Sequence, residues 1–278
     1  MHISLDSALG QQRRLNQVGE SITQIAPDPA AAYSLRSLTG GDPKVVRVRR
    51  DTGGAAGDND EEDFTASEVS SGALVDFVGS GNDGFVETWY DQSGNGNNAV
   101  QATAGSQPKI VEAGALLTKG VTFDGTNDSL VLTSTLGQTN LGSYFLVSEI
   151  NNTSGFKFIF DNRDSGSDGS ILFSENADMK FQFQSTSAAV STSTSTSLTS
   201  AFQTGSNTTI GINGGTLSSA SNTSTINVTT IPKIGTKSFS TEQNFMAGEI
   251  AELIVYNTDQ TDNRTALETN INSHYSIF

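Results

Sequence analysis

The sequence predicts an all-β protein, an antiparallel jelly-roll β-sandwich with a short N-terminal helical arm and a short C-terminal helix. From residue 121 onward, short apolar runs recur between turn residues, for example at 130–132 and 181–183. Their brevity, their β-branched or aromatic content and their turn boundaries are typical of an antiparallel sandwich. The 28 glycines against 5 prolines favour short strands joined by tight turns. The 278 residues suit one sandwich with an appendage.

The N-terminal stretch with helical spacing lies in residues 5–25, where apolar side chains recur three or four residues apart. Pro27 and Pro29 end it and mark a linker. We therefore predict an anchoring arm and linker over residues 1–29 and the sandwich over 30–278. The arm residues expected to contact a partner are Leu5, Leu9, Arg13, Arg14, Leu15, Val18 and Ile22.

Charge is distributed unevenly along the chain. The first 50 residues hold seven basic and four acidic residues, a balance of +3. Because the formal net charge of the whole chain is −15, the remaining 228 residues carry −18. The asymmetry fits an arm that docks onto an acidic partner surface, and equally fits solvated arginines on an ordinary strand. The overall acidity argues against a nucleic-acid partner.

Two local patterns follow the arm. Residues 44–49 alternate as a half-buried strand with basic residues on one side. Residues 51–63 combine glycines with clustered carboxylates, and this predicts a loop that is either simply solvated or holds Ca²⁺ through its oxygens. Ca²⁺ is the one cofactor that we consider.

The second half continues the strand pattern to the C-terminus. Residues 191–200 are nearly pure Ser and Thr, which suits either a linker or a solvent-facing strand. Residues 249–256 form the clearest strand, and Leu267, Ile271 and Tyr275 then predict a short helix that covers the sandwich edge.

The residue inventory removes most catalytic chemistry. Cysteine is absent, and His2 and His274 are the only histidines. Thiolate sites, a cysteine nucleophile and most zinc sites are therefore excluded. A Ser-His-Asp arrangement would require a terminal histidine deep in a cleft.

Several segments resemble a known group of proteins. These are residues 32–36, 45–50, 88–99 (TWYDQSGNGNNA), 107–110 (QPKI), 123–128 (FDGTND) and the closing strand at 248–257. Together they look like the laminin-G/concanavalin-A-like sandwiches of tailed-phage virion proteins, over residues 30 to 275. Residues 1–10 show no basic segment followed by an apolar core, so we expect no secretory signal.

This resemblance implies a structural virion protein of a tailed bacteriophage: a capsid decoration, a fibre or a tail-associated component. Its arm would anchor it to other virion proteins, and its sandwich would bind host or environmental glycans. We accordingly expect a virion location, neither nucleic acid nor membrane as partner, and homo-oligomers as one arrangement.

The WYDQSGNGN segment also resembles fungal α-L-arabinofuranosidases, over roughly residues 30–128. Those enzymes are disulfide-bonded, whereas this chain has no cysteine. Glu175 is the one candidate nucleophile, and no acid/base partner matches it. We therefore predict that the chain is not an enzyme. The alternatives are a carbohydrate-binding module outside a virion and a glycoside hydrolase of the arabinofuranosidase type.

Two polar turns supply the candidate site. Trp89 and Tyr90 offer a large anchor, after which Gly94 and Gly96 admit positive φ. The carboxyl and amide groups nearby serve either as turn residues or as ligands of a calcium ion or a sugar at the sandwich rim. The candidate rim residues are Asp91, Asn95, Asn97, Asp124, Asn127 and Asp128.

Overall fold

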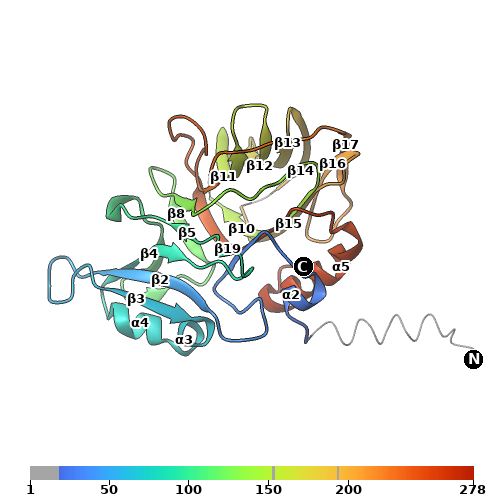
Figure 1. Cartoon of the computed structure of the whole chain (residues 1–278). Helices are drawn as coiled ribbons and strands as arrows, with labels where there is room; N and C mark the ends of the chain where they lie inside the picture. The colour runs from blue at the N-terminus through green and yellow to red at the C-terminus, as the bar shows by residue number, and fades with distance from the viewer. Residues whose placement is uncertain (1–18, 152–153, 193) are drawn as a thin grey trace, which may run out of the picture.

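The computed structural model describes residues 19–151, 154–192 and 194–278. Antiparallel strands form two curved layers packed face to face, with a few short helices on the outside (Figure 1). The predicted all-β sandwich with a short C-terminal helix is confirmed. No helix in the described residues is both long enough and apolar enough to cross a bilayer.

The first layer follows the pairing order β3, β2, β4, β5, β9, β18, β11, β12, β13 and β14. These strands span Glu61–Thr65, Lys44–Asp51, Asp83–Trp89, Ala99–Val100, Leu130–Leu132, Lys233–Ile234, Phe156–Arg163, Gly169–Glu175, Asp178–Phe183 and Thr186–Ser191, in that order.

The second layer follows the order β1, β19, β10, β15, β16 and β17. Its strands span Ala31–Ser34, Ala247–Tyr256, Gly142–Ile150, Ser197–Gln203, Asn207–Ile212 and Ser218–Ser221. Strand β8 (Val121–Asp124) joins the layers, because it pairs with β19 on one side and with β6 (Lys109–Glu112) on the other. β6 also pairs with β4 and with β7 (Ala115–Leu116).

The helices are short and lie at the periphery. They are α2 (Ile22–Ile25), α3 (Ala66–Ser71), α4 (Ala73–Val78) and α5 (Arg264–Tyr275), with 3-10 turns η1 (Ala104–Ser106) and η2 (Thr261–Asn263).

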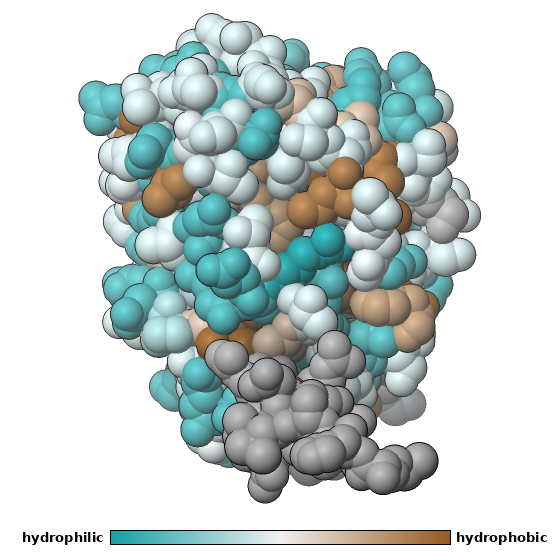
Figure 2. All heavy atoms as spheres, turned by 90° about the vertical axis from the view of Figure 1, so that its right-hand side faces the viewer, coloured by the Kyte–Doolittle hydropathy of each residue, from teal (hydrophilic) through white to brown (hydrophobic). Residues whose placement is uncertain are grey.

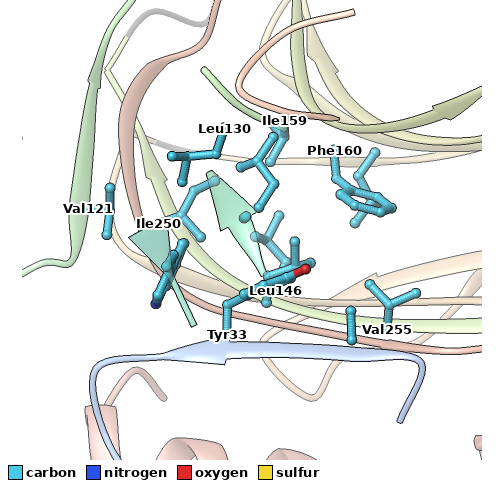
Figure 3. Packing of buried hydrophobic residues seen from close by; sticks show 14 of the residues in the cluster. Tyr33, Val121, Leu130, Leu146, Ile159, Phe160, Ile250 and Val255 are labelled. Carbon is cyan, nitrogen blue, oxygen red and sulfur yellow. The ribbon is translucent and has the colours of Figure 1, made fainter. Parts of the chain in front are cut away.

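The main core fills the space between the layers. Tyr33, Leu146, Phe160 and Val255 meet there from both layers (Figure 3). Trp89 is fully buried in the same cluster, with its ring centroid 5.7 Å from that of Tyr33. The anchor interpretation of Trp89 is therefore confirmed.

A second core lies on the outer face of the second layer, under α2 and α5. Phe145 and Tyr256 point outward from β10 and β19, and Ile22 and Ile271 cover them from the two helices. The Tyr256 hydroxyl also donates to the carbonyl of Ala26 at 3.0 Å. The face that carries β16, β17 and α5 is mostly polar, with a short apolar band across it (Figure 2).

Residues 22–26 therefore belong to the packed domain, although the sequence suggests that they are part of a separable arm. Ile22 is fully buried, and α2 begins at a capping box formed by Ser21 and Gln24. The other six predicted arm residues, Leu5, Leu9, Arg13, Arg14, Leu15 and Val18, lie outside the described residues. An anchoring role for that segment stays a prediction.

The basic strand is neutralised by its neighbour. Residues 61–63, expected in a loop, form part of β3 and pair with β2. Lys44 and Arg47 bind Asp63 at 2.8 and 3.0 Å, and Arg47 also binds Glu61 at 3.0 Å. These basic residues are thus satisfied within the first layer, which favours the ordinary-strand interpretation for β2.

The end of the Ser/Thr-rich tract, residues 197–200, belongs to the second layer. Residues 197–203 form β15, which is buried along its whole length between the main core and α5. Ser200 donates to Glu268 of α5 at 2.7 Å. The helix supplies the Ser200 hydroxyl with a partner, whereas Thr199 Oγ1 of the same strand is buried without one among the described residues.

Ile22→Ala should lower the free energy of unfolding by about 2–4 kcal/mol, because it opens a cavity under α5. Denaturant unfolding of the full chain measures this. A deletion ending at residue 18 keeps the second core intact and serves as the control. Equal stability of Ile22→Ala and the unmodified chain would show that α2 contributes nothing to the packing.

Candidate functional site

A cleft of about 640 Å³ lies where β19, β8, β6, β4 and β2 run side by side. Its floor is a row of cross-strand partners. Glu249 of β19 lies opposite Thr122 of β8, and Thr122 lies opposite Lys109 of β6. Lys109 is paired with Phe85 of β4, which is in turn paired with Arg49 of β2. Directly paired residues share one face of a sheet, so all five side chains point into the cleft.

A β-bulge sends Glu249 to this face. Leu253 and Ile250 both enter the main core although they are three residues apart, because the pairing of β10 with β19 skips Ala251. In a regular strand, Glu249 would share the face of Leu253 and point inward. Gly120 packs against the bulge with φ +119°, and a Cβ there would lie 2.2 Å from the carbonyl oxygen of Ile250. The bulge therefore requires glycine at this position.

Phe85 is the aromatic centre of the floor, with a half-buried ring. The Arg49 guanidinium lies 4.9 Å and the Lys109 ammonium 5.6 Å from the ring centroid. Arg49 is fixed by Gln107 at 2.7 Å and by Asn59 at 3.0 Å. The ring therefore sits in a rigid frame of polar side chains.

Asp128 forms part of the wall and is 7% exposed. Its Oδ2 accepts the backbone N–H of Asp124 at 2.9 Å. Burial raises the pKa of Asp128 to about 7, against the lowering effect of that hydrogen bond. A carboxyl that gains or loses its proton near neutral pH therefore faces the cleft.

Glu249 and Thr122 leave hydrogen-bonding capacity unused. Within the described part of the chain, Glu249 Oε2 and Thr122 Oγ1 are both buried without a partner. Burial also raises the pKa of Glu249, whereas a hydrogen bond from Asn151 lowers it. Unsatisfied buried groups cost about 1–3 kcal/mol each. Both unpartnered atoms belong to residues that line this end of the cleft.

The first predicted rim group serves the fold. Asp91 accepts the backbone N–H groups of Ala32, Ser93 and Asn97, each at 2.9 Å, and the Ser93 hydroxyl at 2.6 Å. These four bonds use the full acceptor capacity of a carboxylate. Asn95 and Asn97 donate to the carbonyls of Pro29 and Ala30, at 2.9 and 2.8 Å. The three side chains thus tie residues 91–98 to the start of β1, and a ligand role for them stays a prediction.

The second rim group is divided. Asp124 and Asp128 line the cleft, whereas Asn127 does not. Asp124 holds its own turn by accepting the backbone N–H groups of Thr126 and Asn127 at 2.7 and 3.2 Å, and Asn127 donates to the carbonyl of Gly105 at 2.7 Å. Glu175, the candidate nucleophile, lies at the end of β12 outside this cleft and pairs with Lys180 at 2.7 Å.

Sequence reasoning named none of the five floor residues as site residues, and it did not show that Thr122, Lys109 and Phe85 would align with Glu249. Each comes from a different strand. The available signal was the alternation of each strand, which marks outward positions but does not give the register between strands.

Comparisons with known proteins identify the architecture. No family model matches the sequence. No curated protein matches it either. Among solved structures, an arabinofuranosidase complexed with arabinofuranosyl-α-1,2-xylobiose superposes with a TM-score of 0.68 at 13% identity, over 91% of this chain and 65% of that one. A mutant GH54 α-L-arabinofuranosidase soaked with 4-nitrophenyl α-L-arabinofuranoside gives 0.66 at 13% identity, over 91% and 65%.

These likenesses define the class of fold, a β-sandwich shared with glycoside hydrolases. The chain spans about 65% of the length of the arabinofuranosidases. They overturn our prediction that the chain is not an enzyme, since the fold that covers nine-tenths of it is found in arabinofuranosidases, including one soaked with a cyclic sulfate inhibitor. The lack of cysteine and of internal histidine does not exclude an enzyme, because glycoside hydrolysis needs only carboxyl groups.

The described residues contain no group of three or more His, Asp or Glu side chains arranged to hold a metal ion. Calcium binding at the rim turns or at the acidic loop stays a prediction.

Asp128→Asn should change how stability depends on pH. The raised pKa of Asp128 means that the folded state holds its proton more tightly than the unfolded chain, whose pKa is near 3.8. The tighter proton binding by Asp128 stabilises the folded state. This stabilisation is fully present below pH 3.8 and is lost as pH rises through about 7. Relative to Asp128→Asn, the unmodified chain should lose about 2–4 kcal/mol between pH 4 and pH 8.

Denaturant unfolding at several pH values measures this difference, with Glu175→Gln, which changes a half-buried carboxyl outside the cleft, as the control. Parallel curves for the unmodified chain and Asp128→Asn would show that Asp128 ionises normally in the fold.

Proposed function

We propose that the chain is a glycan-binding β-sandwich whose ligand occupies the cleft over Phe85. The observation that carries the proposal is the row of cross-strand partners on the cleft floor. It places one aromatic ring between hydrogen-bonding side chains on a concave surface. Ligand sites combine an apolar contact surface with a few fixed polar groups. A sugar ring has the same two-sided character, with C–H groups on its face and hydroxyls at its edge.

The polar groups are placed to read hydroxyls. Thr122 and Glu249 provide acceptors without partners at one end of the row. Asp128 and Gln107 lie along the walls, and Gln107 is held by Arg49. The fixed positions of these side chains reduce the ordering cost of binding.

Phe85→Ala should weaken glycan binding about five- to thirtyfold, since stacking contacts of this kind contribute on the order of 1–2 kcal/mol. A glycan array with the purified full chain identifies the best ligand, and isothermal titration then compares the variant with the unmodified chain. Phe156→Ala, which removes a half-buried phenylalanine on β11 outside the cleft, is the matched control. Equal affinity of Phe85→Ala and the unmodified chain would place the glycan elsewhere.

Glycoside hydrolysis in the same cleft is the second candidate. It is favoured by Asp128, whose pKa of about 7 suits a proton donor at neutral pH, and by the presence of Glu249 as a further carboxyl. The arabinofuranosidase likeness supports it at the level of the fold.

We expect turnover of aryl glycosides, arabinofuranosides among them, that falls at least about 100-fold in Asp128→Asn, the usual effect of removing a general acid. Release of the aryl group is followed over many hours. Glu175→Gln should keep the activity, because its ion pair with Lys180 lies outside the cleft. Loss of turnover in Glu175→Gln but not in Asp128→Asn would move the chemistry to the end of β12.

Placement on a phage virion, with capsid or tail proteins as partners, is compatible with a glycan-binding sandwich and stays a proposal. Its support is the sequence resemblance alone, whereas the structural likenesses are to carbohydrate-active proteins.

A further inference from the structure

We infer that the ligand of the cleft is a sugar with a protonated amine, a hexosamine. The inference rests on the proposed glycan site and names the chemical class that the site selects. It follows from the charges that line the cleft and from which of them already have partners.

Carboxyl groups outnumber cations in the cleft. Five carboxyls and two cations line it: Asp51, Glu112, Asp124, Asp128 and Glu249 against Arg49 and Lys109. Both cations are already compensated. Lys109 binds Asp83 at 2.9 Å and Glu112 at 3.2 Å. Arg49 lies 3.8 Å from Asp51 and also donates to Gln107 and Asn59.

Three carboxyls therefore have no ion-pair partner, and only longer-range interactions with Lys109 and Lys119 act on Asp128 and Glu249. Within the described residues, Asp124, Asp128 and Glu249 form no ion pair. Asp124 holds its turn through Oδ1. Asp128 is more than nine-tenths buried, its Oδ2 is occupied by the Asp124 N–H, and its Oδ1 accepts no hydrogen bond from any described residue. The remaining oxygen of this carboxyl in the cleft wall is a binding position for a hydrogen-bond donor.

An ammonium group fits this arrangement better than a metal ion. Ca²⁺ needs six to eight converging oxygens, and the described residues offer no converging group of carboxylates. An ammonium is compact and donates up to three hydrogen bonds, so one carboxyl and neighbouring hydroxyls or carbonyls satisfy it. Its bonds to a carboxylate are roughly twice as strong as neutral ones.

The sugar ring supplies the rest of the contact. Its apolar face lies on Phe85, and its amine points to the wall formed by Asp128. A uronic acid in the same pose would bring its carboxylate to Asp124, Asp128 and Glu249, and like charges disfavour it. The site should therefore rank sugars by charge: amine first, neutral second, carboxylate last.

Isothermal titration of the full chain with three tetrasaccharides tests the ranking: the β-1,4 glucosamine tetramer, its fully N-acetylated counterpart and the galacturonic acid tetramer, at pH 7 and low salt. An ammonium beside Asp128 lowers the pKa of that carboxyl from about 7, so the carboxylate forms when the amine binds. The glucosamine tetramer should bind about tenfold tighter than the N-acetylated one, equivalent to about 1.4 kcal/mol. The galacturonate tetramer should bind weakest. The preference for the amine should shrink as salt is raised, since charge attraction is screened.

Asp128→Asn and Glu249→Gln each replace a carboxyl group by an amide of nearly the same size, so they remove the negative charge and keep the side-chain shape. Each should cut the preference for glucosamine over its N-acetylated form to about twofold, because it weakens binding of the glucosamine tetramer more than binding of the N-acetylated one. Two variants are used so that a folding defect in one, seen by circular dichroism, leaves the other as the test. Glu112→Gln is the matched control, because Glu112 lines the same cleft but is paired with Lys109.

The outcomes separate the two proposals. Glucosamine binding no tighter than its N-acetylated form, or a preference that survives in both Asp128→Asn and Glu249→Gln, overturns the amine inference and leaves a neutral glycan site standing. Tightest binding of galacturonate overturns it as well. If no glycan of any class binds, the proposed function fails together with the inference.

Discussion

The β-bulge in β19 is the constraint on which the site and both cores depend. β19 is hydrogen-bonded on both edges, to β10 along one side and to β1 and β8 along the other. Beyond the bulge, Leu253 and Val255 fill the main core while Ile254 and Tyr256 fill the second one. Before it, the alternation is reversed, so Ile250 enters the core and Glu249 faces the cleft. One extra residue thus converts a strand buried on both faces into the edge of a binding surface.

The same strand also buries a charge. Glu252 is fully buried and accepts two hydrogen bonds from Arg36, at 2.7 and 2.9 Å, and a third from the Tyr275 hydroxyl at 3.2 Å. Arg36 follows β1 and Tyr275 ends α5, so the pair links β1, β19 and the C-terminal helix. Buried pairs add little net stability, but removing one partner is costly. We therefore regard this contact as fixing how the helix seats on the sheet.

The two polar turns differ in whether their carboxyl groups have hydrogen-bonding capacity left for a ligand. The side chain of Asp91 has all its acceptor positions filled by the chain itself, and it holds residues 91–98 against β1. Asp128 has one oxygen filled and is buried beside an open cleft. Both residues stand in Asp/Asn/Gly-rich turns, and nothing in their local sequence distinguishes the one from the other. The difference lies in what packs against each turn.

Sequence alone determined the strand-rich fold, the buried role of Trp89 and the C-terminal helix, because these follow from local alternation, turn chemistry and helical spacing. It also brought Asp124 and Asp128 into consideration as rim residues. Tertiary structure decided the rest. The register that aligns Glu249, Thr122, Lys109 and Phe85 joins segments up to 164 residues apart and depends on a bulge that no local pattern reveals. Likewise, Ile22 looks like part of an arm in sequence, and only its burial under α5 makes it core. Pairing between distant strands is set by the packing of the whole sandwich, and so the site it creates cannot be derived from any one segment.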